Sequence, residues 1–117
     1  MADIEQISAI NDKLRKGVAL VCIRGQTRAV FPKVEGIKAK LLLNCNVEAV
    51  KVPRIIDAVN TYDSFEEGND PYGERDFGKV EVDGEKYFFK FDYVDDNWEF
   101  HKVNGNRVLT IYPTREH

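Results

Sequence analysis

The sequence predicts a single α+β domain, residues 1–117, in which two helices pack on one face of an antiparallel sheet dominated by a four-stranded C-terminal meander. Apolar residues recur at helical spacing near the N-terminus and again after residue 52. From residue 79 onward they alternate at every second position between turn signals, as in half-buried strands. A chain of 117 residues can bury one ordinary core without a metal or disulfide.

The first helix is expected over Ile4–Lys16. Asp3 followed by Gln6 resembles a capping box, and Gly17 offers a C-terminal stop. The apolar residues at helical spacing are Ile4, Ile7, Ile10 and Leu14. They predict one buried face on this helix.

A buried strand is expected over Val18–Arg24, with Cys22 as a small buried apolar residue. Phe31-Pro32 interrupts a second candidate strand, and Val34–Leu43 fits either a strand or a short helix. The second helix is expected over Pro53–Tyr62, since proline is tolerated in a first helical turn.

The C-terminal half predicts four strands joined by three turns. The turn signals are Asp83-Gly84, Asp95-Asp96-Asn97 and Asn104-Gly105, and Trp98–His101 is the expected third strand. Within the second strand four aromatic residues share one face, namely Tyr87, Phe89, Phe91 and Tyr93. This face is expected to lie against the helices, with Phe88, Lys90 and Asp92 on the other face.

Negative charge is concentrated in one third of the chain. Residues 63–99 carry thirteen acidic and four basic residues, whereas the whole chain has a net charge of only −3. Such a field attracts cations or basic protein surfaces and repels nucleic acid. The acidic and basic positions predicted to bind a partner are Asp70, Glu74, Arg75, Asp76, Glu81, Asp83, Glu85, Asp95 and Asp96.

The stretch from Asn69 to Gly78 allows two interpretations. Asp70-Pro71-Tyr72-Gly73 fits a type I turn, after which Glu74, Arg75 and Asp76 would form a local ion-pair cluster. Alternatively, carboxylates of this stretch and of the next strand could bind a divalent cation for phosphodiester hydrolysis, with Lys90 beside them. The four candidate ligands are Asp70, Glu74, Asp76 and Asp92.

Other kinds of site have little support in the sequence. Cys22 and Cys45 lack a CxxC pattern, and His101 has no metal-ligating partner at a useful spacing. The chain has no phosphate-binding glycine loop and no apolar run long enough to span a bilayer. With the acidic and polar start Met1–Glu5, we expect a cytoplasmic protein without signal peptide, disulfide framework, cofactor or membrane association.

Four motifs resemble a known family. They are the run Ile10–Arg15, the loop Asn69–Gly78, the strand residues Phe88, Lys90, Asp92 and Tyr93, and the strand Arg107–Ile111. Together they resemble the bacterial family catalogued as domain of unknown function 3768, whose signature reads NDPxGEHDFG, WKIDYYD and RVLTIMLAxEY. The resemblance covers the first helix and everything from Ile55 onward.

This chain departs from that signature at several positions. Arg75 stands where the family has histidine, Phe88 where it has tryptophan, residues 112–117 diverge, and residues 25–52 are longer than the usual connector. The resemblance implies an accessory protein of plasmids, phages or integrated elements. A catalytic role for the family histidine would make this member inactive, so Arg75 favours binding over catalysis.

The sequence therefore predicts a non-enzymatic protein whose acidic residues contact a basic partner, such as a nucleic-acid-processing complex of the host. The mobile-element context points to inhibition of a CRISPR or restriction complex. The carboxylate-based hydrolase or nuclease is the alternative, and a subunit of an assembly encoded nearby is a third possibility.

Overall fold

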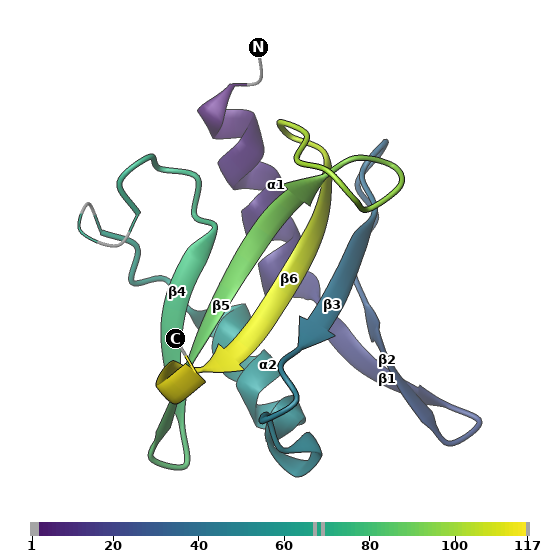
Figure 1. The fold of residues 1–117 in the computed structure, drawn as a ribbon, viewed down its shortest axis with the longest axis vertical. Helices are drawn as coiled ribbons and strands as arrows, with labels where there is room; N and C mark the ends of the chain where they lie inside the picture. Colours follow the sequence, from purple (N-terminus) through teal and green to yellow (C-terminus); the bar gives the residue numbers. More distant parts are fainter. Residues whose placement is uncertain (1–2, 67, 69, 117) are drawn as a thin grey trace.

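The computed structural model describes residues 3–66, 68 and 70–116, and these form an α+β fold (Figure 1). Two α-helices, two short 3-10 helices and six strands occur in the described part of the chain. In chain order they are α1 (Ile4–Gly17), β1 (Ala19–Ile23), β2 (Gln26–Val30), β3 (Ala39–Leu43), η1 (Ala49–Lys51), α2 (Val52–Thr61), β4 (Phe77–Val82), β5 (Glu85–Val94), β6 (Asn106–Pro113) and η2 (Thr114–Glu116). The predicted fold class is confirmed.

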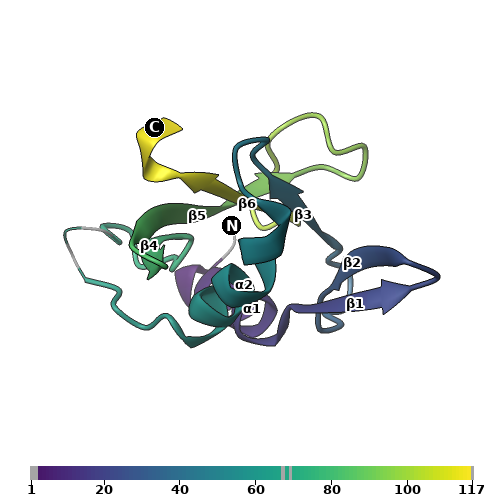
Figure 2. The same ribbon diagram turned by 90° about the horizontal axis from the view of Figure 1, so that it is seen from below.

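The main sheet has four strands in the order β3-β6-β5-β4, and both α-helices lie on one side of it (Figure 2). β4, β5 and β6 are antiparallel neighbours, whereas β3 runs parallel to β6. The four-stranded C-terminal meander is therefore wrong in one respect: three of its strands exist, and the fourth place in the sheet is taken by β3. The sheet is mixed rather than purely antiparallel.

Trp98–His101 does not form the expected strand, because the preceding turn at Asp95 binds backbone amides that a strand ladder would need. The Asp95 carboxylate accepts hydrogen bonds from the amides of Asn97 and Glu99, both at 3.1 Å, and Trp98 has a φ of 62°. An aspartate that binds nearby amides competes with a strand ladder. A single bridge between Val94 and His101 is what the structure retains of this pairing.

Both predicted helices are confirmed to within one residue at each end. Asp3 is the N-cap of α1, and its carboxylate accepts a hydrogen bond from the Glu5 amide at 3.1 Å. Pro53 lies in the first turn of α2, where its missing N–H costs nothing. Neither described helix is long and apolar enough to cross a membrane.

The strand predicted over Val18–Arg24 exists as β1, but it is not buried. β1 pairs with β2 in a separate two-stranded sheet, so much of the hairpin surface faces solvent, and Cys22 is exposed. The turn has φ values of 53° at Arg24 and 77° at Gly25, the arrangement of a two-residue hairpin turn. Val34–Leu43 was predicted as either a strand or a short helix, and its second half forms the strand β3.

The core lies between β5 and the helices. Tyr87, Phe89 and Phe91 are buried on the helix-facing side, as the alternation predicts. Gly78 on β4 packs directly under the rings of Phe89 and Tyr62, and a Cβ atom there would overlap both rings. The sequence therefore requires glycine at this position for packing rather than for turn geometry.

Candidate functional site

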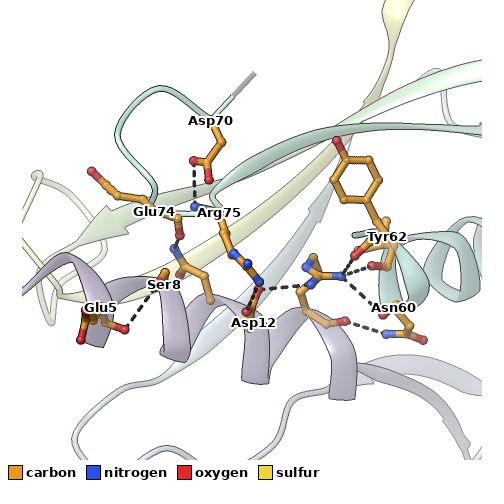
Figure 3. A network of polar contacts seen from close by, with 11 residues as sticks. Glu5, Ser8, Asp12, Asn60, Tyr62, Asp70, Glu74 and Arg75 are labelled. Atoms are coloured by element: carbon orange, nitrogen blue, oxygen red, sulfur yellow. Dashed lines mark hydrogen bonds and ion pairs between the residues drawn. The ribbon is translucent and has the colours of Figure 1, made fainter. Parts of the chain in front are cut away.

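The described part of the loop between α2 and β4 contains a turn at Asp70–Gly73. The Gly73 amide donates to the Asp70 carbonyl at 3.1 Å, which confirms the predicted turn. The Asp70 carboxylate accepts a hydrogen bond from the Arg75 amide at 3.0 Å, and Arg75 has a φ of 57° (Figure 3). Asn69, the first residue of the predicted stretch, lies outside the described residues.

Arg75 pairs with α1 rather than with its sequence neighbours. Its guanidinium lies 2.8 Å from the carboxylate of Asp12, 63 positions earlier in the chain (Figure 3). The expectation of a local cluster of Glu74, Arg75 and Asp76 was therefore wrong. The backbone bond to Asp70 turns the Arg75 side chain toward the helix, so the ion pair ties the loop to α1.

Asp12 also pairs with Arg15, a buried residue that joins the ends of the two helices. The Arg15 guanidinium lies 3.2 Å from Asp12 and donates to the carbonyls of Val59 and Tyr62 at 2.9 and 2.6 Å. In the opposite direction, the side-chain amide of Asn60 donates to the backbone carbonyl of Arg15 at 2.7 Å. The last carbonyls of a helix need such partners, so Arg15 acts as a side-chain cap for α2.

A second buried network lies behind the loop. The Asn11 amide donates to the Tyr93 hydroxyl at 2.8 Å and to the Glu74 carbonyl at 3.0 Å. Arg107 donates its Nε–H to the Asn11 side-chain oxygen Oδ1 at 2.8 Å, and its guanidinium carbon lies 4.5 Å from the centre of the Tyr93 ring. This network connects α1, the loop, β5 and β6 at one end of the sheet.

Burial shapes the electrostatics of this network. Burial, followed by the hydrogen bond with the Glu74 side chain, raises the pKa of Tyr93 far above its ordinary value, so Tyr93 remains a protonated donor. Burial and the charge of Glu74 raise the pKa of Asp76. Burial lowers the pKa of Arg107, against the opposing influence of Tyr93, Glu74 and Asp76. The negative charges of Glu74 and Asp76 therefore partly compensate the cost of burying the Arg107 guanidinium.

The exposed side of this assembly forms one surface. Tyr72, at the tip of the turn, is 75% exposed, and Ile4 of α1 lies beside Gly73. Glu5 and Asp12 contribute carboxylates from α1, as Figure 3 shows. We call this the helix–loop surface; its residues are Ile4, Glu5, Asp12, Asp70, Tyr72, Glu74 and Arg75.

Three further predicted binding residues lie around the β4–β5 turn. Glu81 and Asp83 are exposed, and Glu85 is half-buried. Asp83 forms an ion pair with Arg54, and Glu85 lies 3.6 Å from Lys51 and 2.6 Å from Arg115. Figure 1 shows this turn at the end of β4 opposite the α2–β4 loop, so the structure does not join these residues to the helix–loop surface.

Asp95 and Asp96 lie in the loop after β5 and serve its local structure. Hydrogen bonds from the Glu99 amide and neighbouring amides lower the pKa of Asp95. Asp96 accepts a hydrogen bond from the Asn106 side chain at 3.4 Å. The nine predicted binding positions thus fall into three places, and their role in binding stays a prediction.

The four carboxylates of the metal alternative are only partly brought together. Asp76 and Asp92 line a shallow pocket of about 490 Å³ with Tyr93 and His101. Asp92 lies 3.7 Å from Lys90 on the face of the sheet that the helices leave uncovered, while Asp70 binds the Arg75 amide. Within the described ranges, no group of three or more histidine, cysteine or acidic side chains is arranged to hold a metal ion.

The residues of α1 that contact the loop and its network were not among the predicted site residues. Asn11 and Arg15 fall on the inward side of the helix, in step with Ile7 and Leu14, and all four are buried. Polar residues at core-facing positions of an amphipathic helix need buried partners. This pattern was the available signal that α1 takes part in a polar network.

A family model described as "Protein of unknown function (DUF3768)" matches residues 32–116. The matched range contains the loop and β3 to β6 and begins after α1. No curated protein and no solved structure matches the chain.

Proposed function

The chain belongs to the DUF3768 family, and we propose that it is a non-enzymatic binding protein that docks its helix–loop surface on a basic protein surface. The observation that carries the proposal is the placement of Tyr72, a large side chain 75% exposed on a turn held by hydrogen bonds. Exposed tyrosines on ordered turns are frequent energetic centres of protein interfaces.

The described segment from Asp70 to Arg75 is organised in the absence of a partner. The Asp70 turn and the Arg75–Asp12 ion pair fix both sides of Tyr72, so little conformational entropy is lost when it binds. Preorganisation of this kind favours recognition.

Charge defines the kind of partner. The surface combines the carboxylates of Glu5, Asp12, Asp70 and Glu74 with the single guanidinium of Arg75. Its charge is complementary to a surface rich in lysine and arginine and repels nucleic acid.

The specific role that we propose is anti-defence: inhibition of a CRISPR or restriction complex by occupying its nucleic-acid-binding surface. Such surfaces are basic because they neutralise phosphates. The resemblance to proteins of mobile elements supports the same role, and the cytoplasm is the compartment where such complexes act.

The test is binding of the purified protein to purified CRISPR and restriction complexes, compared with Tyr72→Ala. We expect the substitution to weaken binding by more than ten-fold, the effect of losing an interface anchor worth about 2 kcal/mol or more. Phe100→Ala is the matched control, because Phe100 is 70% exposed in a different loop. Equal affinity of wild type and Tyr72→Ala, or no binding to any such complex, would contradict the proposal.

The metal-dependent hydrolase remains an alternative proposal, with Asp76 and Asp92 as its neighbouring carboxylates. Saturable stabilisation by a divalent cation is the observation that would favour it.

A further inference from the structure

A groove of about 640 Å³ lies between the β1–β2 hairpin and β3, on a part of the molecule separate from the helix–loop surface. Leu20 and Ala29 line it from the hairpin, Leu41 and Leu43 from β3, and Val47 and Val52 from the segment that enters α2. In Figure 1 the hairpin lies beyond the outer edge of β3. A ligand could bind here whether or not the helix–loop surface binds a partner.

One wall of the groove is a strand edge that no other strand pairs with in the described part of the chain. β3 is the last strand of the sheet on this side and pairs with β6. The Lys38 carbonyl accepts from the Arg107 amide, and the Asn44 amide donates to the Ile111 carbonyl, both at 2.9 Å. Because backbone groups alternate along a strand, those of Ala39, Leu41 and Leu43 point away from β6, toward the groove.

The groove is surrounded by positive charge, in contrast to the acidic third of the chain. Residues 19–43 contain five basic residues and one acidic residue, Glu35. Arg28 and Lys40 line the groove itself. All five basic residues are exposed, namely Arg24, Arg28, Lys33, Lys38 and Lys40.

We infer that the groove binds an extended acidic peptide segment of a partner protein, which adds to the free edge of β3 as a further strand. Free strand edges bind peptides in this way: main-chain hydrogen bonds provide affinity, and alternate side chains enter apolar pockets. Here the apolar walls take every second side chain, and Arg28 and Lys40 attract acidic side chains between them.

The test selects peptides from a phage-displayed random library on the full-length protein. We expect the recovered peptides to be acidic and to alternate apolar with polar residues. A synthetic peptide of the recovered sequence should slow amide hydrogen exchange at Ala39, Leu41 and Leu43. These amides report strand addition directly, whereas binding elsewhere on the surface would leave them unchanged.

Two variants address the backbone and the charge separately. Leu43→Pro removes an N–H that faces the groove while leaving the bonds to β6, and an edge strand tolerates proline at such a position. Leu43 is only 37% exposed, so the folded state of this variant is checked by its melting temperature. Arg28→Glu changes an exposed side chain and keeps the test decisive if the proline variant unfolds.

We expect each folded variant to bind the selected peptide at least ten-fold more weakly. Lys79→Glu, a charge reversal on β4 at the opposite edge of the sheet, should bind like wild type. Recovery of no peptides or of basic peptides, or unchanged binding by Arg28→Glu, would overturn the inference. So would self-association through the groove or binding of single-stranded DNA that Arg28→Glu abolishes, because the occupant would then be another.

Discussion

Arg107 donates its Nε–H to the side-chain oxygen of Asn11 at 2.8 Å, and both residues are fully buried. The two residues are 96 positions apart. Through Asn11, the same contact reaches Tyr93 and the backbone of Glu74. The position of the candidate binding loop therefore depends on a buried polar network rather than on the loop sequence alone.

Asn11→Ala should destabilise the fold by about 1–3 kcal/mol, because it leaves buried donors and acceptors without partners. Arg107 would lose its Nε acceptor, and the Glu74 carbonyl would lose a donor. Urea unfolding measures the effect, with Lys13→Ala as a control at an exposed position of α1. If the midpoint of Asn11→Ala matches that of the control, the network contributes little to stability.

The sequence predicted elements whose pattern is local. The N-cap at Asp3, the proline in the first turn of α2 and the alternation through Phe89 and Phe91 each act within a few residues, and the structure confirms them. The parallel pairing of β3 with β6 joins residues far apart in sequence, and no local signal distinguishes it from an antiparallel meander. The strand predicted over Trp98–His101 is absent for another local reason. The Asp95 carboxylate accepts hydrogen bonds from nearby backbone amides, and the alternation of apolar residues carries no information about such bonds.

The candidate site was predictable to a smaller extent. The turn at Asp70–Gly73 follows from its residue types and is confirmed. The partner of Arg75 is Asp12 on α1, and a contact across 63 residues cannot be derived from spacing. Charge counts likewise located an acidic third of the chain but not the three separate places where the predicted binding positions lie.

Phe89→Ala should cost about 3–5 kcal/mol, as expected when a large aromatic side chain leaves a cavity in a packed core. Phe89 is fully buried and packs edge-on against Tyr62 and Phe65, with ring centres at 5.2 and 6.4 Å. That is a large share of the stability of a small domain. Thermal and urea unfolding measure it, and a near-wild-type melting temperature would show that the ring is not essential to the core.

Asp76→Asn should stabilise the protein at neutral pH. Burial and Glu74 raise the pKa of Asp76, so the folded chain binds this proton more tightly than the unfolded chain does. The associated stability is present below the unfolded value of about 3.9 and is lost as the pH rises through the folded pKa. The difference in unfolding free energy between Asp76→Asn and wild type should therefore increase as the pH rises from about 3.9 through the folded pKa, and then stay constant.

Urea unfolding of wild type and Asp76→Asn from pH 3.5 to 7 measures that difference. Asp57→Asn, at an exposed position of α2, reports the effect of removing a single negative charge. A difference between wild type and Asp76→Asn that stays constant across the interval would contradict the raised pKa.

Millimolar Mg²⁺, Mn²⁺ or Ca²⁺ should change the melting temperature little. A ligand that binds the folded chain stabilises it by mass action, so a metal site would give a saturable increase. Thermal unfolding with and without each cation makes the measurement. An increase that Asp76→Asn abolishes would favour the metal-dependent hydrolase over the binding protein.

Charges that steer association with a partner act differently from side chains that anchor the bound complex. Glu81, Asp83 and Glu85 lie away from the helix–loop surface, and two of them are paired with cations. Changing all three to lysine should slow association with a basic partner while leaving dissociation almost unchanged, because distant charges act mainly by steering. Tyr72→Ala should instead speed dissociation.

Association and dissociation rates measured at several salt concentrations distinguish these effects. The difference between wild type and the triple variant should shrink above about 0.1 M salt, where charges more than about 10 Å apart are screened. The fold should survive, since the Asp83 ion pair is exposed, the Glu85 pairs are only partly buried, and ion pairs at a surface contribute little stability. If the triple variant associates like wild type at low salt, the charge of the β4–β5 turn takes no part in recognition. The acidic contribution would then come from the helix–loop surface alone.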